Sequence, residues 1–255
     1  MQRYVLLGAS NLRMGLPLVL ENIRNLSRGE AEVLVASGFG RSYGQWSRFL
    51  FRALPGIVDC GLWDSFNGWE TGNQPVRALI TDVGNDLLYG NSPEQITDWV
   101  GNCLTRLQRV ASDVVITLPP LDSVKTLSRL RYGLARTLLF PKCRTPLSEM
   151  SRLAEELTQR LDELARRFGF QALELPGEWY GLDPVHYRRS QRSRAWRTAL
   201  CGWRGVDAGD WLTCPSGEIK RAVRNGVPAM FRKRGRQLTG PQPTIQIGEF
   251  RTSMY

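Results

Sequence analysis

The chain has 255 residues, 42% of them hydrophobic, and a formal net charge of +10. This length and composition can bury the core of one large domain, and they exclude a disordered or fibrous protein. The longest apolar runs are far too short to cross a bilayer, so we expect no membrane span.

The strands are predicted from short apolar runs rich in β-branched residues, which alternate with segments of helical period. This alternation is typical of βα units that build a parallel sheet. It predicts an α/β protein, a three-layer α/β/α sandwich of flavodoxin-like shape with a mainly five-stranded parallel sheet. The five predicted strands are residues 4–7, 33–36, 78–83, 114–118 and 170–175.

Between these strands the sequence predicts four helices. Ser92 and Pro93 are typical of a helix start, with Gln95 in place to complete a capping box. Gly169 is placed to end a helix whose leucines form one stripe. The predicted helices span residues 12–26, about 93–107, 123–140 and 148–168.

Two segments lack clean periodicity. Residues 59–75, with several glycines and tryptophans, are expected to form a long loop, and such loops are often functional. After residue 204 the βα rhythm is lost, although residues 244–247 are a plausible strand. We therefore divide the chain into a domain at residues 1–204 and a basic appendage at residues 205–255.

The basic charge lies mostly in the C-terminal part. Residues 1–180 hold 20 basic and 19 acidic side chains, whereas residues 181–255 hold 14 basic and 5 acidic ones. Such a segment can attract nucleic acid, an anionic membrane or an acidic substrate, but it is equally typical of a solvated face. A nucleic-acid or anionic-surface binder therefore stays open as an alternative. Its basic residues are Arg188, Arg189, Arg192, Arg194, Arg197, Lys220, Arg221, Arg224, Arg232, Lys233, Arg234 and Arg236.

The cysteines and the N-terminus bear on the compartment. Five cysteines lie far apart and none belongs to a CxxC pair, so neither a disulfide framework nor a zinc site is predicted. The first apolar run starts at residue 4 and leaves no room for a signal peptide. We expect a cytoplasmic protein with reduced thiols.

Four candidate site residues follow three of the predicted strands. Ser10 follows the first strand, Gly38 and Gly40 follow the second, and Asn85 follows the third. Ligands of open α/β sheets bind at this carboxyl edge. There a serine can expose its hydroxyl, and glycine amides or an asparagine amide can donate to an oxyanion. Each position alone also fits a helix cap or a plain turn.

His186 is the single histidine of the chain and lies after the fifth predicted strand. Asp183 precedes it by three residues. An imidazole suits proton transfer near neutral pH, and a neighbouring carboxylate can fix its tautomer and stabilise the imidazolium. A lone histidine is more often structural, but this one is accompanied by a carboxylate and by a serine at a strand end.

Taken together, these blocks resemble the SGNH/GDSL hydrolase family, whose four blocks supply Ser, Gly, Asn and His in that order. The resemblance covers about residues 4–200. It implies Ser10 as nucleophile, His186 as general base and Asp183 as its orienting acid. It also implies an oxyanion hole formed by the Ser10 amide, Gly38 and Asn85, with Gly40 as the alternative to Gly38.

The resemblance implies an esterase, thioesterase or deacetylase that acts on a small acyl or acetyl ester and needs no metal or other cofactor. The sequence departs from the family at residues 8–11, where Gly-Ala-Ser-Asn stands in place of Gly-Asp-Ser-Leu. Two alternatives remain: a catalytically inactive relative, or a domain that binds a small ligand at the same edge. Four aromatic residues could line a substrate pocket, although core packing is the commoner role for each. They are Trp63, Trp69, Trp179 and Tyr180.

Overall fold

The computed structural model describes residues 1–67, 69, 75–141, 143–181, 183, 185–207, 209 and 211–255. Within these residues, seven strands form the main sheet: β1 (Gln2–Leu7), β2 (Ala31–Ala36), β5 (Val76–Ile80), β6 (Asp113–Thr117), β7 (Gln171–Leu173), β10 (Ile245–Ile247) and β11 (Phe250–Met254). Their order across the sheet is β10-β11-β2-β1-β5-β6-β7.

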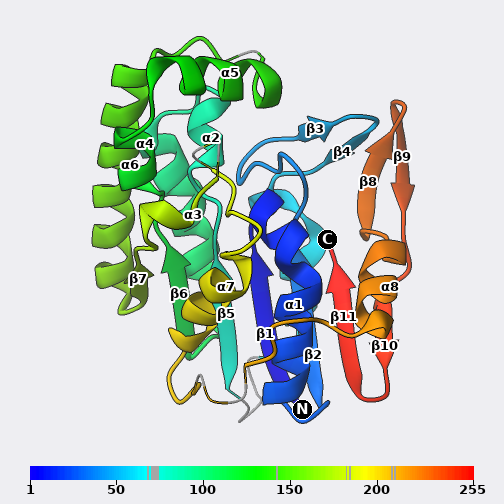
Figure 1. Ribbon diagram of the computed structural model, residues 1–255. Helices are drawn as coiled ribbons and strands as arrows, with labels where there is room; N and C mark the ends of the chain where they lie inside the picture. Colours follow the sequence, from blue (N-terminus) through cyan, green and yellow to red (C-terminus); the bar gives the residue numbers. More distant parts are fainter. Residues whose placement is uncertain are drawn as a thin grey trace.

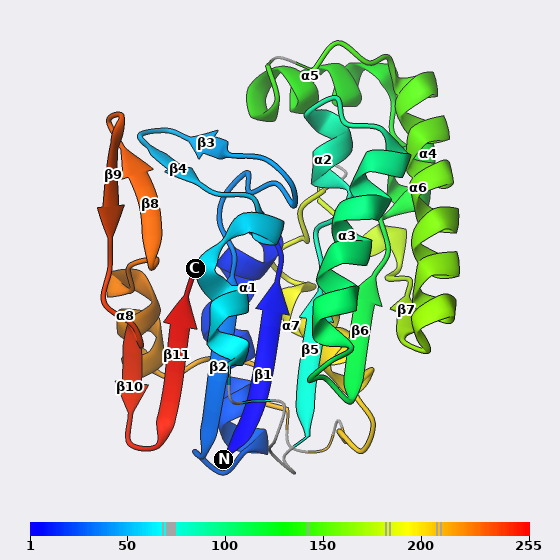
Figure 2. The same ribbon diagram turned by 180° about the vertical axis from the view of Figure 1, so that it is seen from behind.

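The five predicted strands are all present, and they pair in parallel as β2-β1-β5-β6-β7. Counted along the chain, this order is 2-1-3-4-5, the flavodoxin-like arrangement. Helices cover both faces of the sheet (Figures 1 and 2). The predicted three-layer α/β/α fold is therefore confirmed, with β10 and β11 added at one edge.

The two faces of the sheet bury two separate cores. Along β1, Val5 and Leu7 join one core, whereas Tyr4 and Leu6 join the other. This alternation follows from the two-residue period of a strand. Because both faces are covered, the strand consists of a continuous hydrophobic run.

The helices are bounded as follows: α1 (Ser10–Leu26), α2 (Asn85–Leu88), α3 (Pro93–Leu107), α4 (Leu121–Lys125), α5 (Arg129–Leu139), α6 (Leu147–Phe168), α7 (Arg192–Cys201) and α8 (Gly217–Asn225). The Ser92 hydroxyl accepts a hydrogen bond from the Gln95 amide at 3.2 Å, and Gly169 ends α6 in a left-handed conformation. Both predicted helix boundaries are confirmed.

Several predicted elements are wrong in their extent. Of the fifth strand predicted at residues 170–175, only Gln171–Leu173 forms β7. The single helix at residues 123–140 is divided into α4 and α5, because the Ser128 hydroxyl accepts from the Arg131 amide and starts a new helix. The predicted third strand runs too far, since β5 ends at Ile80 and Asp82 has a φ of 62°. A left-handed residue cannot continue an extended strand.

The predicted loop at residues 59–75 contains structure in its first half. Two short 3₁₀ helices, η1 (Ile57–Asp59) and η2 (Gly61–Phe66), occupy it. A third, η3 (Gly177–Trp179), follows β7. The glycines at positions 68 and 72 of the predicted loop lie outside the described residues.

The C-terminal segment contributes to both sheets. Strand β11 pairs in parallel with β2, and β10 pairs antiparallel with β11, at the place of the strand predicted for residues 244–247. Strands β8 (Met230–Lys233) and β9 (Arg236–Thr239) join β3 (Ser47–Phe49) and β4 (Arg52–Leu54) in a second sheet. That second sheet stands beyond the carboxyl end of the main sheet (Figure 1).

Candidate active site

The candidate site lies where the order of the parallel strands reverses. After β1 the chain first adds β2 on one side of β1, and it later adds β5 on the other side. Ser10 follows β1, and Asn85 follows β5, so both flank this switch point. Open α/β sheets bind their ligands at such a point.

Ser10, His186 and Asp183 form one chain of hydrogen bonds. Nε2 of His186 lies 2.8 Å from Oγ of Ser10, and Nδ1 of His186 lies 3.0 Å from Oδ1 of Asp183. An ionised carboxylate only accepts hydrogen bonds, so Nδ1 donates to Asp183. Nε2 is then the acceptor for the Ser10 hydroxyl, which is the arrangement that lets the imidazole remove the serine proton.

The Asp183 carboxylate is kept in its ionised form by its hydrogen bonds. Oδ1 accepts from the backbone amides of Val185 at 3.0 Å and His186 at 2.7 Å. Burial alone would raise the pKa of Asp183. The hydrogen bonds from His186, together with its charge and the Val185 amide, outweigh burial and hold that pKa below its usual value. Leu182 and Pro184, the other members of this sequence block, lie outside the described residues.

The turn that carries Ser10 is held by the carboxylate of Asp82, which follows β5, the strand beside β1. Asp82 accepts hydrogen bonds from the backbone amides of Ala9 at 2.8 Å and Leu12 at 3.1 Å, on either side of Ser10. Burial raises the pKa of Asp82, against these bonds and one from Asn11. Since the first amides of a helix have no partner within it, Asp82 caps α1 and fixes Ser10 at its first turn.

Asn11 connects the nucleophile turn to the histidine loop. Its Nδ2 donates to Asp82 Oδ1 at 2.9 Å and to the Val185 carbonyl at 2.6 Å, and its Oδ1 accepts from the Tyr187 amide at 3.1 Å. The two backbone partners lie immediately before and after His186. The Asn11 side chain therefore holds the loop that carries His186 at a fixed distance from the turn that carries Ser10.

The predicted oxyanion donors do not all lie at the same place. Asn85 opens α2, is 5% exposed and lines the cleft together with Ser10, His186 and Gly40. Gly38 lines a neighbouring cavity instead, where a Cβ atom would lie 2.3 Å from Leu54. The structure thus brings Gly40, the alternative donor, into the cleft with Ser10.

A second buried carboxylate links the Gly40 loop to the Asn85 helix. Asp86 accepts from the Ser42 hydroxyl and, at 2.8 Å, from the Tyr43 amide. Burial raises the pKa of Asp86 to about 6, although these hydrogen bonds lower it. Asp86 therefore joins the loop after β2 to α2 through these two hydrogen bonds.

The cleft around Ser10 is large and mostly apolar, with about 2390 Å³ of empty space that includes its open mouth. Its apolar lining comes from α1, the loop after β2, β3, α2 and the end of α5. These residues are Met14, Phe39, Trp46, Phe49, Leu88, Tyr89, Leu139 and Phe140. Such a lining suits the carbon skeleton of an ester.

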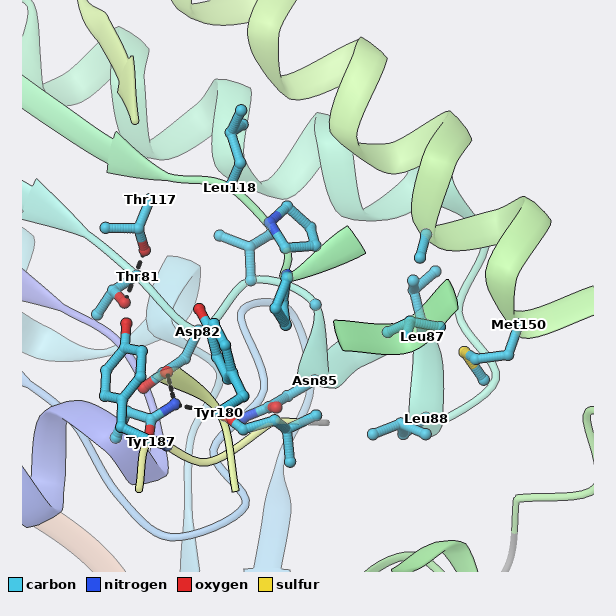
Figure 3. A pocket seen from close by; sticks show the side chains of 18 of the residues that line it. Thr81, Asp82, Asn85, Leu87, Leu88, Thr117, Leu118, Met150, Tyr180 and Tyr187 are labelled. Carbon is cyan, nitrogen blue, oxygen red and sulfur yellow. Dashed lines mark hydrogen bonds between the residues drawn. The ribbon is translucent and has the colours of Figure 1, made fainter. Parts of the chain in front are cut away.

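A second cavity adjoins the cleft behind the turn that carries Asn85. Asn85, Leu88 and Tyr187 line both spaces. Asp82, Tyr180 and Tyr187 lie toward one end of it, and Leu87 and Met150 toward the other (Figure 3). Its empty space, part of it open to solvent, is about 640 Å³ and is bounded mainly by apolar side chains.

The aromatic residues considered for a pocket from the sequence are mostly core residues. Trp69 and Trp179 are buried, and Trp63 packs against the core. Tyr180 is also buried and lines the second cavity. The aromatic side chains of the cleft itself come from Phe39, Trp46, Phe49, Tyr89 and Phe140.

Further predictions from the sequence concern the cysteines, metal and membrane binding, and the basic residues. The described cysteines are all free, with Cys60, Cys103 and Cys143 buried, Cys201 partly buried and Cys214 exposed. Within the described ranges, no group of three or more His, Cys, Asp or Glu side chains could hold a metal ion. No helix in those ranges is long and apolar enough to span a membrane. The basic residues of the C-terminal part lie around α7, α8 and the second sheet.

Comparison with known proteins gave matches among solved structures, whereas no family model and no curated protein matches. A member of the lipolytic protein G-D-S-L family from Veillonella parvula DSM 2008 is 13% identical, with a TM-score of 0.47 over 79% of this chain and 96% of that chain. The SGNH-hydrolase family esterase AlinE4 is 16% identical, with a TM-score of 0.39 over 68% and 76%.

The psychrotrophic esterase EstA from Pseudoalteromonas sp. is 11% identical, with a TM-score of 0.45 over 79% of this chain and 95% of that chain. SGNH and GDSL hydrolases are thus among the structures that this chain resembles. Identities and TM-scores this low assign no function, so function is inferred below from the geometry of the site.

Two residues of the site were missed in the sequence. Asp82 was placed within the predicted third strand without a role of its own, and Asn11 was treated only as a departure from the family motif. The available signal was Asn11 itself, a polar residue directly after Ser10 where the family motif has leucine. Only the fold shows that both side chains meet beside His186.

Proposed function

We propose that this protein is a serine esterase that hydrolyses carboxylic esters through Ser10, His186 and Asp183. The observation that carries the proposal is the continuous hydrogen-bonded chain from Ser10 Oγ through the imidazole to Asp183, at 2.8 and 3.0 Å. Its position at the switch point of the sheet and its opening into an apolar cleft support the same function.

In the first half of the reaction, His186 Nε2 takes the proton of Ser10 while Oγ forms a bond to the ester carbonyl carbon. The carbonyl electrons move to oxygen, and the oxyanion accepts hydrogen bonds from the Ser10 amide, the Gly40 amide and Asn85 Nδ2. When the oxyanion collapses, the bond to the alcohol oxygen breaks. His186 gives its proton to that oxygen, and the alcohol leaves.

In the second half, His186 takes a proton from water as the water oxygen attacks the acyl-serine. Collapse of the second oxyanion breaks the bond to Ser10 Oγ, which recovers its proton from Nε2. Asp183 stabilises the imidazolium in both halves and fixes its orientation. The acyl group occupies the second cavity, because that cavity is apolar and begins at Asn85 and Leu88.

Thioesters and acetyl esters fit the same chemistry, and a cytoplasmic location remains the expectation from the sequence. The proposal is tested by hydrolysis of 4-nitrophenyl acetate, butyrate and octanoate by the wild type and by Ser10→Ala. We expect release of 4-nitrophenolate by the wild type and loss of at least 10³-fold in the variant. Equal rates for the two proteins would refute a Ser10 nucleophile.

A further inference from the structure

A cavity beside the cleft contains two arginines and, among its described lining residues, no carboxylate. Arg13 and Arg52 both line it. Phe39, Ser47 and Phe49 line this cavity and also the cleft around Ser10, so the two spaces adjoin. A molecule bound at Ser10 can therefore extend into this cavity.

Arg13 reaches the cavity from α1, three residues after Ser10. Its Nη2 donates to the Val223 carbonyl at 3.3 Å, whereas its Nη1 is buried and has no hydrogen-bond partner among the described residues. Burial, and then the charge of Arg52, lowers the pKa of Arg13. A buried donor without a partner is costly, so a small movement of the guanidinium that lets Nη1 reach an acceptor in the cavity would be favourable.

Arg52 opens β4 and is exposed at the rim. Its guanidinium lies over the Phe231 ring, 4.9 Å from the centroid, which fixes its position. In the part of the chain that the structure describes, neither Arg13 nor Arg52 forms an ion pair. The two positive charges repel each other, and an anion bound between them would attract both.

We propose that this cavity binds an anionic group, a carboxylate or a phosphate, on the alcohol part of the ester substrate. The proposal rests on the esterase function inferred above. A guanidinium recognises either group through paired hydrogen bonds. The alcohol part is assigned here because the apolar cavity that begins at Asn85 receives the acyl part, while the arginines line a different space.

The first test uses two aryl esters that differ only in charge, 4-carboxyphenyl butyrate and its neutral isostere 4-carbamoylphenyl butyrate. The kcat/KM ratio of the charged to the neutral ester is measured for the wild type, Arg13→Gln and Arg52→Gln. We expect the ratio to fall at least tenfold in both variants. Arg152→Gln, which removes an exposed positive charge from α6, is the control and should keep the ratio within twofold. A ratio that is equal in all four proteins would overturn the proposal.

The second test is binding of inorganic phosphate, measured by titration calorimetry at constant ionic strength, and it does not depend on hydrolysis. We expect binding by the wild type and Arg152→Gln and its loss in Arg13→Gln and Arg52→Gln. If neither ester is hydrolysed but phosphate binds in this pattern, the esterase function fails and the anion site stands. If phosphate binds in this pattern but the ester ratio does not change, the site binds a separate anion and the substrate assignment is wrong.

Discussion

The side chain of Asn11 donates a hydrogen bond to the backbone carbonyl of Val185 at 2.6 Å, although the two residues are 174 positions apart in the chain. Asn11 follows Ser10, the proposed nucleophile, and Val185 precedes His186, the proposed base. The same amide group bonds to Asp82, which caps the helix that starts at Ser10. The relative position of Ser10 and His186 is therefore set by a residue that takes no part in the proton transfers.

Replacement of Asn11 by alanine should lower kcat by about 10²-fold, because a small displacement of reacting groups has an effect of that size. It also removes the Asn11 bond to Asp82 Oδ1 and the hydrogen-bond partner of the Val185 carbonyl and of the Tyr187 amide, which should lower the free energy of unfolding by about 1 to 3 kcal/mol. Ester hydrolysis and chemical denaturation measure the two effects.

Asn22→Ala is the matched control for Asn11. Asn22 lies on the same helix and bonds to Leu18 and twice to Leu212, far along α1 from Ser10. We expect this control to lose similar stability while it retains kcat. Equal loss of kcat in the two variants would show that Asn11 acts only through stability.

Asn85→Ala should reduce kcat by about 10² to 10³-fold, the usual effect of removing one oxyanion donor. The side chain of Asn85 lines the cleft at the nucleophile, so the free energy of unfolding should change little. Steady-state hydrolysis of 4-nitrophenyl butyrate measures the effect. A variant within a few-fold of the wild type would exclude Asn85 as a donor.

Asp183→Asn should reduce kcat by about 10³ to 10⁴-fold, because a neutral amide cannot stabilise the imidazolium and can favour the wrong tautomer. The variant should still fold, since an amide oxygen can accept from the Val185 and His186 amides as Asp183 does. The measurements are kcat and the thermal unfolding midpoint. Retention of full activity would mean that Asp183 only shapes the loop.

Asp86→Asn should change how stability depends on pH. The folded protein binds a proton at Asp86 with a pKa of about 6, above the ordinary 3.8, so this group favours folding most at low pH. Its contribution is lost as the pH rises from about 4 to about 6. The stability of the wild type relative to the variant should therefore fall across this range, by roughly 3 kcal/mol at about 1.4 kcal/mol per pKa unit.

Chemical denaturation of both proteins at pH 4.5 and pH 7.5 checks this pH dependence, and about 2 kcal/mol of the change should appear between these two pH values. The pKa of Asp82 is also raised, but Asp82 is present in both proteins and cancels in the difference. Asp98→Asn, at an exposed position of α3, should show no comparable trend. A difference between wild type and Asp86→Asn that stays constant with pH would contradict the raised pKa.

The elements of the fold that the sequence predicted are those with strong local signals. Continuous hydrophobic runs mark the five parallel strands, and Ser92 and Gly169 mark helix ends. The break between α4 and α5 was missed because Ser128 was not recognised as a helix cap. The pairing of β11 with β2 joins residues more than 200 positions apart, and local patterns carry no information on such a contact.

The site shows the same division between local and non-local information. Ser10, Asp183, His186 and Asn85 were found because each follows a strand whose end lies at the carboxyl edge. Asp82 was not assigned a role, since its capping of α1 requires β1 and β5 to be neighbours. The sequence left Gly38 and Gly40 as alternative donors, and in the structure Gly40 lines the cleft with Ser10 whereas Gly38 lines the neighbouring cavity.

The most direct test of an activated serine is labelling with a fluorophosphonate probe, followed by mass spectrometry of the modified peptide. Such a probe reacts with a serine only when a neighbouring base increases its nucleophilicity. We predict one label per wild-type chain, on Ser10, and no label in Ser10→Ala or His186→Ala. Folded wild-type protein that does not react, or a label on another serine that persists in both variants, would contradict the proposed catalytic site.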